Sequence, residues 1–283
     1  VCRLLDAHLR GAGLRGFTKT TGSVPAYIDT EGVEHTLDRR GMANIGEQLA
    51  MIRRASREGA EVLILECMAV QPELQRVSQR DMVRGDVNVV TNVRYDHSFE
   101  MGETLEEIAG SLSAVIPAGG ALFTADEEWF PYFRERCQAL GSKAFLCRSG
   151  EEADENQAMA RAVGAYLGVP AETFHDHIRA YQQDFGARHL YRQENGQAFV
   201  NLFSANDPQS TRMLLDRYLP NPAEAVLLYN NRSDRPDRLL LFARHFFPHI
   251  RCRKVVVMGE ARGLACRLLR RSGLPVERAE DWR

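Results

Sequence analysis

The stretch Val62-Leu63-Ile64-Leu65-Glu66 consists of four consecutive aliphatic residues followed by a carboxylate. A continuous apolar run of this length, without alternation, is typical of a parallel strand that is buried on both faces. Similar short runs recur at residues 87–93, 121–124, 143–147, 225–229 and 254–258. Stretches with helical periodicity fill the gaps between these runs. The sequence therefore predicts an α/β fold built from βαβ units.

The alternation of strands and helices is interrupted between about residues 154 and 181, where two helical segments follow each other. Beyond them, residues 188–193 and 198–204 flank Glu194-Asn195-Gly196, which predicts a β-hairpin. Strand and helix then alternate again to the end of the 283 residues, a length typical of two domains. We therefore expect one α/β domain over residues 1–183 and a smaller one over residues 184–283.

The composition excludes several classes of protein. Apolar residues make up 44% and charged residues 26%, which is typical of a soluble globular chain and not of a disordered one. The net charge of −2 gives no basis for nucleic-acid binding, which depends on a surplus of basic residues. Six cysteines without a C-x-x-C pair indicate reduced thiols in a cytosolic protein. The chain opens at Val1 inside a helical pattern, so we expect a missing upstream segment.

Polar residues at the ends of the predicted strands are candidate ligands, because open α/β sheets bind ligands beyond the carboxyl ends of their strands. Glu66 ends its strand and is suited to hold a cation, although a helix cap or a salt bridge would also explain it. Asp96 and His97 follow the next strand and form either a metal ligand with its orienting partner or a structural pair. If the two strands are adjacent, Glu66 and His97 share one site. His175 and His177, two apart on a predicted helix, indicate a solvated helix face.

Other strand ends offer sites for anions. Thr20-Thr21-Gly22 provides hydroxyls and a flexible backbone for a phosphate or carboxylate, or forms an ordinary turn. Asp207 precedes a proline and caps a helix, whose N-terminus also favours anions. A third strand end carries arginines suited to clamp phosphates or carboxylates, or to form a solvated charged surface. These are Arg232, Arg235 and Arg238.

A Walker A phosphate loop is missing from these residues. Residues 13–20 have a similar spacing, but Thr18 occupies the position of the required second glycine. The segment also follows a predicted helix and precedes a predicted strand, which is the reverse of the required order. We therefore reject it as a phosphate loop.

Together the motifs resemble the ligase subunits of poly-γ-glutamate synthases, the PgsB/CapB family of the Mur ligase superfamily. The resemblance covers the chain to about Glu260, and it implies a central Mur-ligase domain with a P-loop-type parallel sheet, here without its loop. A smaller Rossmann-like α/β C-terminal domain is expected to follow. The matching segments are Thr20-Thr21-Gly22, residues 44–48, residues 66–70, residues 92–97, residues 204–211 and residues 231–238.

The resemblance also implies roles for residues of the first domain. Glu66 and His97 match the magnesium ligands of the family, and we expect them to be catalytic. Thr20, Thr21 and Gly22 match the loop near the γ-phosphate of ATP. The carbamylated lysine that many Mur ligases place downstream of the histidine has no counterpart, since the next lysine after position 97 is at position 143.

Further roles are implied for the adenosine and for the substrate. Asn156 matches an asparagine that faces the adenine, and Asp207 lies where the C-terminal domain approaches the ribose. Arg232 and Arg235 are expected to be catalytic, through contact with phosphate or substrate. The remaining expected substrate-binding residues are Asn44, Glu47 and Arg238.

The activity implied by the resemblance is an ATP-dependent and Mg²⁺-dependent ligation. ATP converts a terminal carboxylate into an acyl phosphate, and the amine of an incoming glutamate then displaces phosphate, which extends poly-γ-glutamate. The implied location is the cytoplasm, at the inner face of the membrane, through integral membrane partner subunits or a missing N-terminal segment. Two alternatives remain: another Mur-type amino-acid ligase, or a non-catalytic subunit that binds nucleotide or acts as a scaffold.

Overall fold

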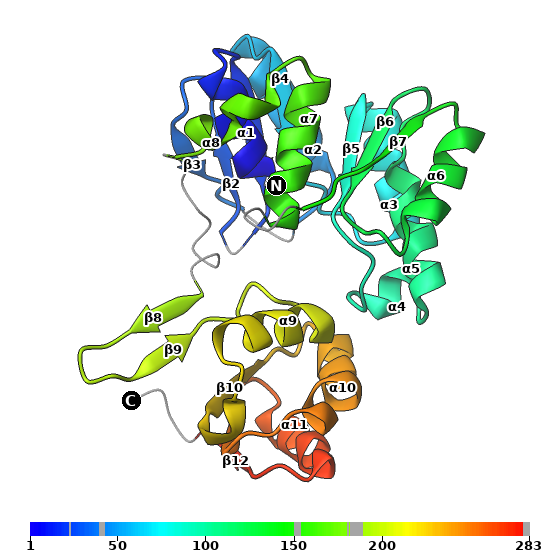
Figure 1. Cartoon of the computed structure of the whole chain (residues 1–283). Helices are drawn as coiled ribbons and strands as arrows, with labels where there is room; N and C mark the ends of the chain where they lie inside the picture. Colours follow the sequence, from blue (N-terminus) through cyan, green and yellow to red (C-terminus); the bar gives the residue numbers. More distant parts are fainter. Residues whose placement is uncertain (23, 40–42, 150–153, 180, 182–188, 280–283) are drawn as a thin grey trace. The chain divides into compact units, whose positions relative to one another are not determined.

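The computed structural model describes residues 1–283 except residues 23, 40–42, 150–153, 180, 182–188 and 280–283. The chain folds into two compact units, which are coloured along the sequence in Figure 1. The first unit comprises residues 1–93 and 100–184, and the second comprises residues 94–99 and 185–283. The short segment 94–99 therefore belongs to the same unit as the C-terminal part of the chain, although it lies far from that part in the sequence.

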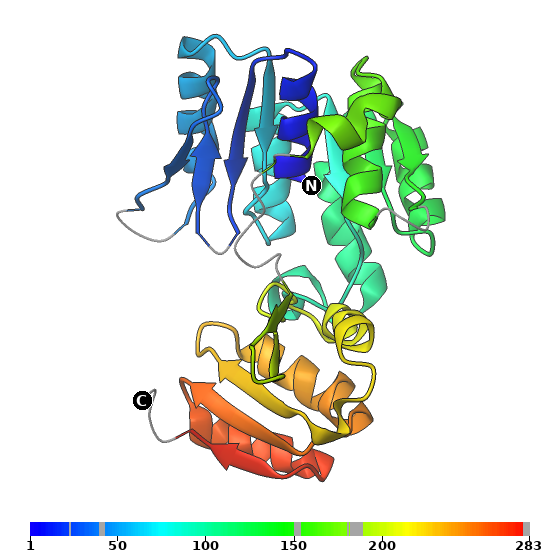
Figure 2. The same ribbon diagram turned by 60° about the vertical axis from the view of Figure 1, so that its left-hand side comes forward.

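The first unit contains a four-stranded sheet with a helix on each face. Its strands have the order β3-β2-β1-β4, with β1 parallel to β4 and antiparallel to β2. Phe17 packs with Met51 of α2 on one face, whereas Leu9 of α1 shares a second core with Ile64. The sheet therefore lies between α1 and α2, shown in dark and light blue in Figure 2. The elements are α1 (Cys2–Gly11), β1 (Gly16–Thr20), β2 (Ala26–Ile28), β3 (Glu34–Thr36), α2 (Gly46–Arg57) and β4 (Val62–Leu65).

A second sheet of the same unit has the order β5-β6-β7, with all strands parallel. After it, α7 and α8 return to pack beside α1, and Met159 and Phe174 complete the core that contains Leu9. The strands are β5 (Val87–Val90), β6 (Ala121–Thr124) and β7 (Lys143–Leu146). The helices are α3 (Pro72–Val77), η1 (Ser78–Val83), α5 (Leu105–Leu112), η2 (Ser113–Val115), α6 (Phe130–Ala139), α7 (Glu155–Tyr166), η3 (Ala171–Thr173) and α8 (Phe174–His177). The short helix α4 (Ser98–Met101) contains residues of both units.

The strands at residues 62–66 and 87–93 are not adjacent, so the condition for a site shared by Glu66 and His97 at one sheet edge is not met. Both strands form, but β4 pairs with β1 and β5 pairs with β6, so in the described part of the chain they belong to different sheets. The reason is local. The β1–β3 meander offers β4 a parallel partner in register with Gly16 to Lys19, and the helical turns α3 and η1 then carry the chain to the second sheet.

The second unit contains the predicted β-hairpin, in which β8 and β9 are antiparallel, and a parallel sheet of order β10-β11-β12. The inward residues Val255 and Val257 pack against Leu215, Phe242 and Leu269 of the helices. The elements are β8 (Leu190–Arg192), β9 (Ala198–Val200), α9 (Pro208–Tyr218), η5 (Pro222–Glu224), β10 (Val226–Asn231), α10 (Pro236–His245), η6 (Phe247–His249), β11 (Lys254–Gly259), α11 (Arg262–Leu269), η7 (Arg270–Ser272) and β12 (Val276–Arg278). Parallel sheets with crossover helices in both units confirm the predicted α/β class.

None of the helices in the described part of the chain combines the length and the apolar character that crossing a bilayer requires.

Candidate functional site

The carboxyl ends of β1 and β4 bring three of the predicted site residues together. The Thr21 N–H donates a hydrogen bond of 2.7 Å to Glu66 Oε2. The Glu66 N–H donates to the Lys19 carbonyl over 3.0 Å, which continues the ladder between the two strands by one residue. Thr21 and Glu66 therefore form one polar edge, which is where open parallel sheets bind their ligands. Thr20 ends β1 directly before this edge, and its buried hydroxyl donates to the Ala26 carbonyl over 3.5 Å.

The first turn of α1 lies near this edge. Burial raises the pKa of the Cys2 thiol to about 11, and the negative charge of Glu66 adds to the increase. The first N–H groups of a helix have no partner within the helix and carry partial positive charge, so they favour anions. A helix N-terminus beside a carboxylate is an arrangement that suits a phosphate together with a cation.

A network of charged and polar side chains from β1 and α2 contacts the polar edge through the backbone of Glu66. The side chain of Lys19 is fully buried, and its Nζ lies 3.4 Å from Glu47 Oε2 and 3.4 Å from Gln48 Oε1. Arg39 pairs with the same Glu47 over 2.8 Å. Gln48 Nε2 in turn donates to the Glu66 carbonyl over 3.2 Å. Glu47 was predicted as a site residue from the sequence, whereas no role was predicted for Lys19 or Gln48, although lysine occurs only three times in the chain.

The network keeps its carboxylate ionised. Burial lowers the pKa of Lys19, and the charge of Glu47 opposes that change. Burial pushes the pKa of Glu47 upward, but the hydrogen bond from Arg39 and the charge of Lys19 hold it below its usual value. Glu47 is thus shared by two cations. Asn44 is exposed and accepts a hydrogen bond from the Gly46 N–H at the start of α2.

Two further predicted nucleotide contacts lie at exposed positions of the first unit. Asn156 is in the first turn of α7, whose N-cap Asp154 accepts a 2.7 Å hydrogen bond from the Gln157 N–H. Gly22 follows Thr21 directly after the strand edge. Their contacts with ATP stay predictions.

In the second unit, Asp207 caps α9 as its sequence context predicts. Its Oδ1 accepts a 2.7 Å hydrogen bond from the Ser210 N–H, and its carbonyl accepts one of 2.8 Å from the Thr211 hydroxyl. The predicted approach of Asp207 to a ribose stays a prediction. Nearby, Arg238 donates to the side-chain oxygen of Asn206 over 2.9 Å.

The segment at residues 94–99 is held by the helices of the second unit. Arg94 donates a hydrogen bond to the hydroxyl of Ser210 in the first turn of α9. The ring of Tyr95 stacks on His245 at the end of α10, with ring centroids 5.4 Å apart and an angle of 1° between the planes. Two adjacent side chains thus bind two different helices.

The next residue of the segment forms an ion pair. Asp96 pairs with Arg235, the N-cap residue of α10, which also lies 3.4 Å from Asp237. The Asp96 side chain further accepts the N–H of His97 over 3.0 Å. His97 has φ of +52°, in the left-handed region that residues other than glycine seldom adopt. We refer to the contacts of residues 94–96 as the clasp.

The three predicted arginines have different surroundings. Arg232 is exposed and forms an ion pair of 2.6 Å with Asp234 two residues away. Arg235 belongs to the clasp. Burial lowers the pKa of Arg238, and the charge of Arg235 lowers it further. Substrate or phosphate contacts by these arginines stay predictions.

Among the residues that the structure describes, no group of three His, Cys, Asp or Glu side chains is arranged to hold a metal ion. Magnesium does not require such a cage, because it is commonly held by one or two carboxylates together with phosphate oxygens and water. The half-buried carboxylate of Glu66, beside the positive end of α1, fits this kind of donor set. Glu66 belongs to the first unit and His97 to the second, so their joint role stays a prediction.

Comparison with known proteins identifies the family. Residues 188–283 match the poly-gamma-glutamate synthase CapB C-terminal domain. PGA synthase CapB of Bacillus subtilis (strain 168) is 30% identical over 302 residues, which cover 99% of this chain and 77% of that protein. The chain belongs to the CapB family of poly-γ-glutamate synthases. A second CapB relative, the capsule biosynthesis protein of Bacillus anthracis, is 33% identical over 303 residues, and the chain spans 65% of its length.

Solved structures show that the CapB chain has the fold of the Mur ligases. MurF from Acinetobacter baumannii superimposes with a TM-score of 0.69 and 12% identity, covering 98% of this chain and 64% of MurF. The bifunctional folylpolyglutamate synthase/dihydrofolate synthase from Yersinia pestis CO92 superimposes with a TM-score of 0.66 and 17% identity, covering 99% of this chain and 77% of that enzyme. These likenesses confirm the predicted Mur-ligase-like fold.

Proposed function

We propose that this CapB chain is part of an ATP-dependent carboxylate–amine ligase that extends poly-γ-glutamate by one glutamate at a time. The observation that supports this most directly is the polar edge of the first sheet. There, Thr21 and Glu66 meet near the N-terminus of α1, where a nucleotide phosphate and its cation can both be bound. Relatives named PGA synthase and CapB point to glutamate as the substrate.

The reaction needs an activated carboxylate. A carboxylate oxygen of the polymer end attacks the γ-phosphorus of ATP, and ADP leaves as the acyl phosphate forms. The amine of glutamate then attacks the carbonyl carbon, phosphate leaves, and the nitrogen loses a proton. Mg²⁺, when bound, neutralises charge on the transferring phosphoryl group.

The residues of the chain supply positioning and charge for this reaction. In our proposal Glu66 holds the metal ion, the N–H groups at the start of α1 bind phosphate oxygens, and the hydroxyls of Thr20 and Thr21 contact the γ-phosphate. Such groups lower the barrier because they are oriented before charge develops. A structure of a bifunctional folylpolyglutamate synthase/dihydrofolate synthase contains Mn, AMPPNP and L-glutamate, which supports nucleotide and divalent metal as cofactors.

The remaining assignments belong to the same proposal. His97 would contribute to the metal site, Asn156 and Asp207 would contact the adenosine, and Asn44 with Glu47 would face the substrate. The arginines at positions 232, 235 and 238 would stabilise anionic groups. The protein would act in the cytoplasm at the inner face of the membrane, with integral membrane partner subunits.

The test is nucleotide binding and turnover by the full-length product of the gene. Calorimetry with AMPPNP and Mg²⁺ should show metal-dependent binding, and ATP hydrolysis should be coupled to incorporation of glutamate in preference to other amino acids. Incorporation of a different amino acid would favour another Mur-type ligase. Absence of nucleotide binding would favour a scaffold subunit.

A matched pair of variants tests the site. Glu61 and Glu66 flank β4, but Glu61 is exposed and pairs with Arg15 at the far end of the strand. We expect Glu66→Gln to weaken metal-dependent AMPPNP binding at least tenfold, which corresponds to about 1.4 kcal/mol. Glu61→Gln should bind like the unaltered protein. Equal binding by both variants would refute the assignment of Glu66.

A further inference from the structure

Lys19 is a charged side chain without exposed surface, directly behind the polar edge of the first sheet. We propose that Lys19 is a positioning residue: its ammonium group orients the Gln48 amide, and that amide holds Glu66 in the geometry that binds the metal ion of the nucleotide. This inference rests on the proposed function, in which Glu66 is a metal ligand.

The alternation of side chains along β1 places Lys19 on the face of the sheet that packs against α2. Phe17 packs against α2, whereas the hydroxyl of Thr18 donates to Asp6 of α1 over 2.7 Å. Lys19, two residues after Phe17, therefore faces the first turn of α2, where Glu47 and Gln48 are located. Hydrogen bonds connect its ammonium group to the site through Gln48.

Burial of an ammonium group has a large cost in desolvation unless it is paired and hydrogen-bonded. Lys19 is 0% exposed and has the carboxylate of Glu47 at 3.4 Å. Glu47 is already paired with Arg39 over 2.8 Å, so the packing of α2 alone does not require a second cation there. The role that accounts for the desolvation cost of the Lys19 ammonium group is the orientation of its second neighbour, Gln48.

The ammonium group determines which end of the Gln48 amide faces which partner. An ammonium only donates hydrogen bonds, so the oxygen Oε1 must face Lys19, and it lies 3.4 Å from Nζ. The NH₂ end is then forced toward the opposite side, where Nε2 donates to the Glu66 carbonyl over 3.2 Å. A Gln48 amide that turned by 180° would lose both interactions.

Glu66 is consequently held at three atoms. Its N–H donates to the Lys19 carbonyl, its carbonyl accepts from Gln48, and its Oε2 accepts from Thr21. The first of these bonds goes to the backbone of Lys19, and the second comes from the amide that the Lys19 ammonium group orients. Partners that orient a metal ligand in this way typically change metal affinity by about 10–100-fold when they are replaced.

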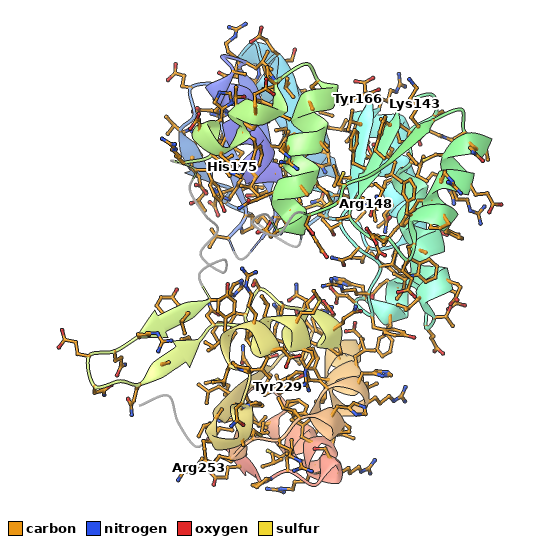
Figure 3. All side chains as sticks on the ribbon, viewed as in Figure 1. Lys143, Arg148, Tyr166, His175, Tyr229 and Arg253 are labelled. Carbon is orange, nitrogen blue, oxygen red and sulfur yellow. The ribbon has the colours of Figure 1, made fainter. Side chains whose placement is uncertain are left out.

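The experiment measures Mn²⁺ affinity in the presence of AMPPNP by electron paramagnetic resonance, on the full-length gene product. The variants are Lys19→Met, which removes the charge and the N–H donors but keeps an unbranched side chain, and Gln48→Glu, which keeps an oxygen for Lys19 but has no N–H for Glu66. Lys143→Met is the matched control, because Lys143 is an exposed lysine at the start of β7 (Figure 3). Amide hydrogen exchange of residues 62–67 gives a second readout that is independent of metal.

We expect Lys19→Met and Gln48→Glu each to weaken Mn²⁺ binding about tenfold or more, and to speed exchange at Glu66, while Lys143→Met has no effect. Gln48→Glu is the sharper test, because added negative charge alone would tighten cation binding. It also decides the question if Lys19→Met does not fold. Unchanged or tighter Mn²⁺ binding by Gln48→Glu would overturn the inference. Failure of the unaltered protein to bind Mn²⁺ with AMPPNP would instead refute the proposed function.

Discussion

His8 shows how one buried side chain links the stability of the first unit to pH. Its ring is 0% exposed, and its Nδ1 lies 3.2 Å from Nδ1 of His177, so only one of these two nitrogens can hold a proton without repulsion. Burial lowers the pKa of His8, and the charge of His177 lowers it further. Phe174 and Gly164 surround the rest of the ring and carry no charge.

The sign of the pH dependence follows from this lowered pKa. Near and below the ordinary value of 6.5, the unfolded chain binds a proton at His8 that the folded chain does not. Stability is therefore fully present above that pH and declines as the pH falls below it. We expect His8→Leu to flatten the decline of the unfolding free energy between pH 7.5 and 5.5, measured by urea denaturation at each pH. His175→Leu, at the exposed neighbouring histidine labelled in Figure 3, should leave the decline unchanged.

Gly164 packs against the His8 ring so closely that there is no room for a Cβ atom. A Cβ at this residue would lie 2.2 Å from Cδ2 of His8, which is far too close for two carbon atoms that are not bonded to each other. We expect Gly164→Ala to reduce the free energy of unfolding by about 1–3 kcal/mol, the usual cost of overpacking. Gly110→Ala is the control, since its Cβ would meet only Tyr132 at 3.5 Å. If chemical denaturation gave the same change in unfolding free energy for both variants, α7 would be able to move away from α1 without loss of stability, which would contradict this prediction.

Some site residues could be predicted from the sequence because their signals are local, whereas others depend on contacts between distant parts of the chain. Glu66 ends an apolar run and Thr21 follows a short predicted strand, so their position at a sheet edge is visible in the sequence. The function of Lys19 depends on which helix its strand face meets, and that contact joins residues far apart in the chain. The predicted solvated surface at the two histidines is right for His175 but wrong for His177, whose contact with His8 spans 169 positions.

At the scale of elements, the clasp defines how the segment at residues 94–99 is held. Arg235 is 15% exposed and pairs with both Asp96 and Asp237, whereas Arg232 is 53% exposed and pairs with Asp234. We expect Arg235→Met to increase amide hydrogen exchange of residues 94–98 clearly, because Asp96 loses its ion pair and no longer anchors the His97 N–H. Arg232→Met should leave this exchange unchanged, since exposed ion pairs contribute about 0–1 kcal/mol.

The elements themselves were more predictable than their pairing. Each apolar run became a strand, and the hairpin formed where Asn195 and Gly196 indicated a turn, because these signals are local. The separation of β4 and β5 into two sheets was not visible, since strand order depends on which edges remain free after the antiparallel meander β1–β3 has formed. The placement of residues 94–99 in the second unit could not be predicted for the same reason, since it depends on contacts with residues far away in the sequence.

At the scale of the whole molecule, the two units have separate hydrophobic cores. Leu9 belongs to the core of the first unit, with α7 and α8, whereas Leu269 belongs to the core around β11 in the second. Both side chains are 0% exposed. Truncation of a fully buried leucine to alanine costs about 2–5 kcal/mol, through lost transfer free energy and the cavity that remains.

This separation predicts reciprocal effects of two matched substitutions. We expect Leu269→Ala to speed hydrogen exchange in β10, β11 and β12 while β5, β6 and β7 stay protected, because the removed methyl groups contact only the second core. Leu9→Ala should give the opposite pattern. Hydrogen exchange followed by mass spectrometry resolves both sets of strands in one experiment. If either substitution accelerated exchange equally in both sets, the units would unfold as one cooperative block, and stability of the CapB fold would have to be assigned to the chain as a whole.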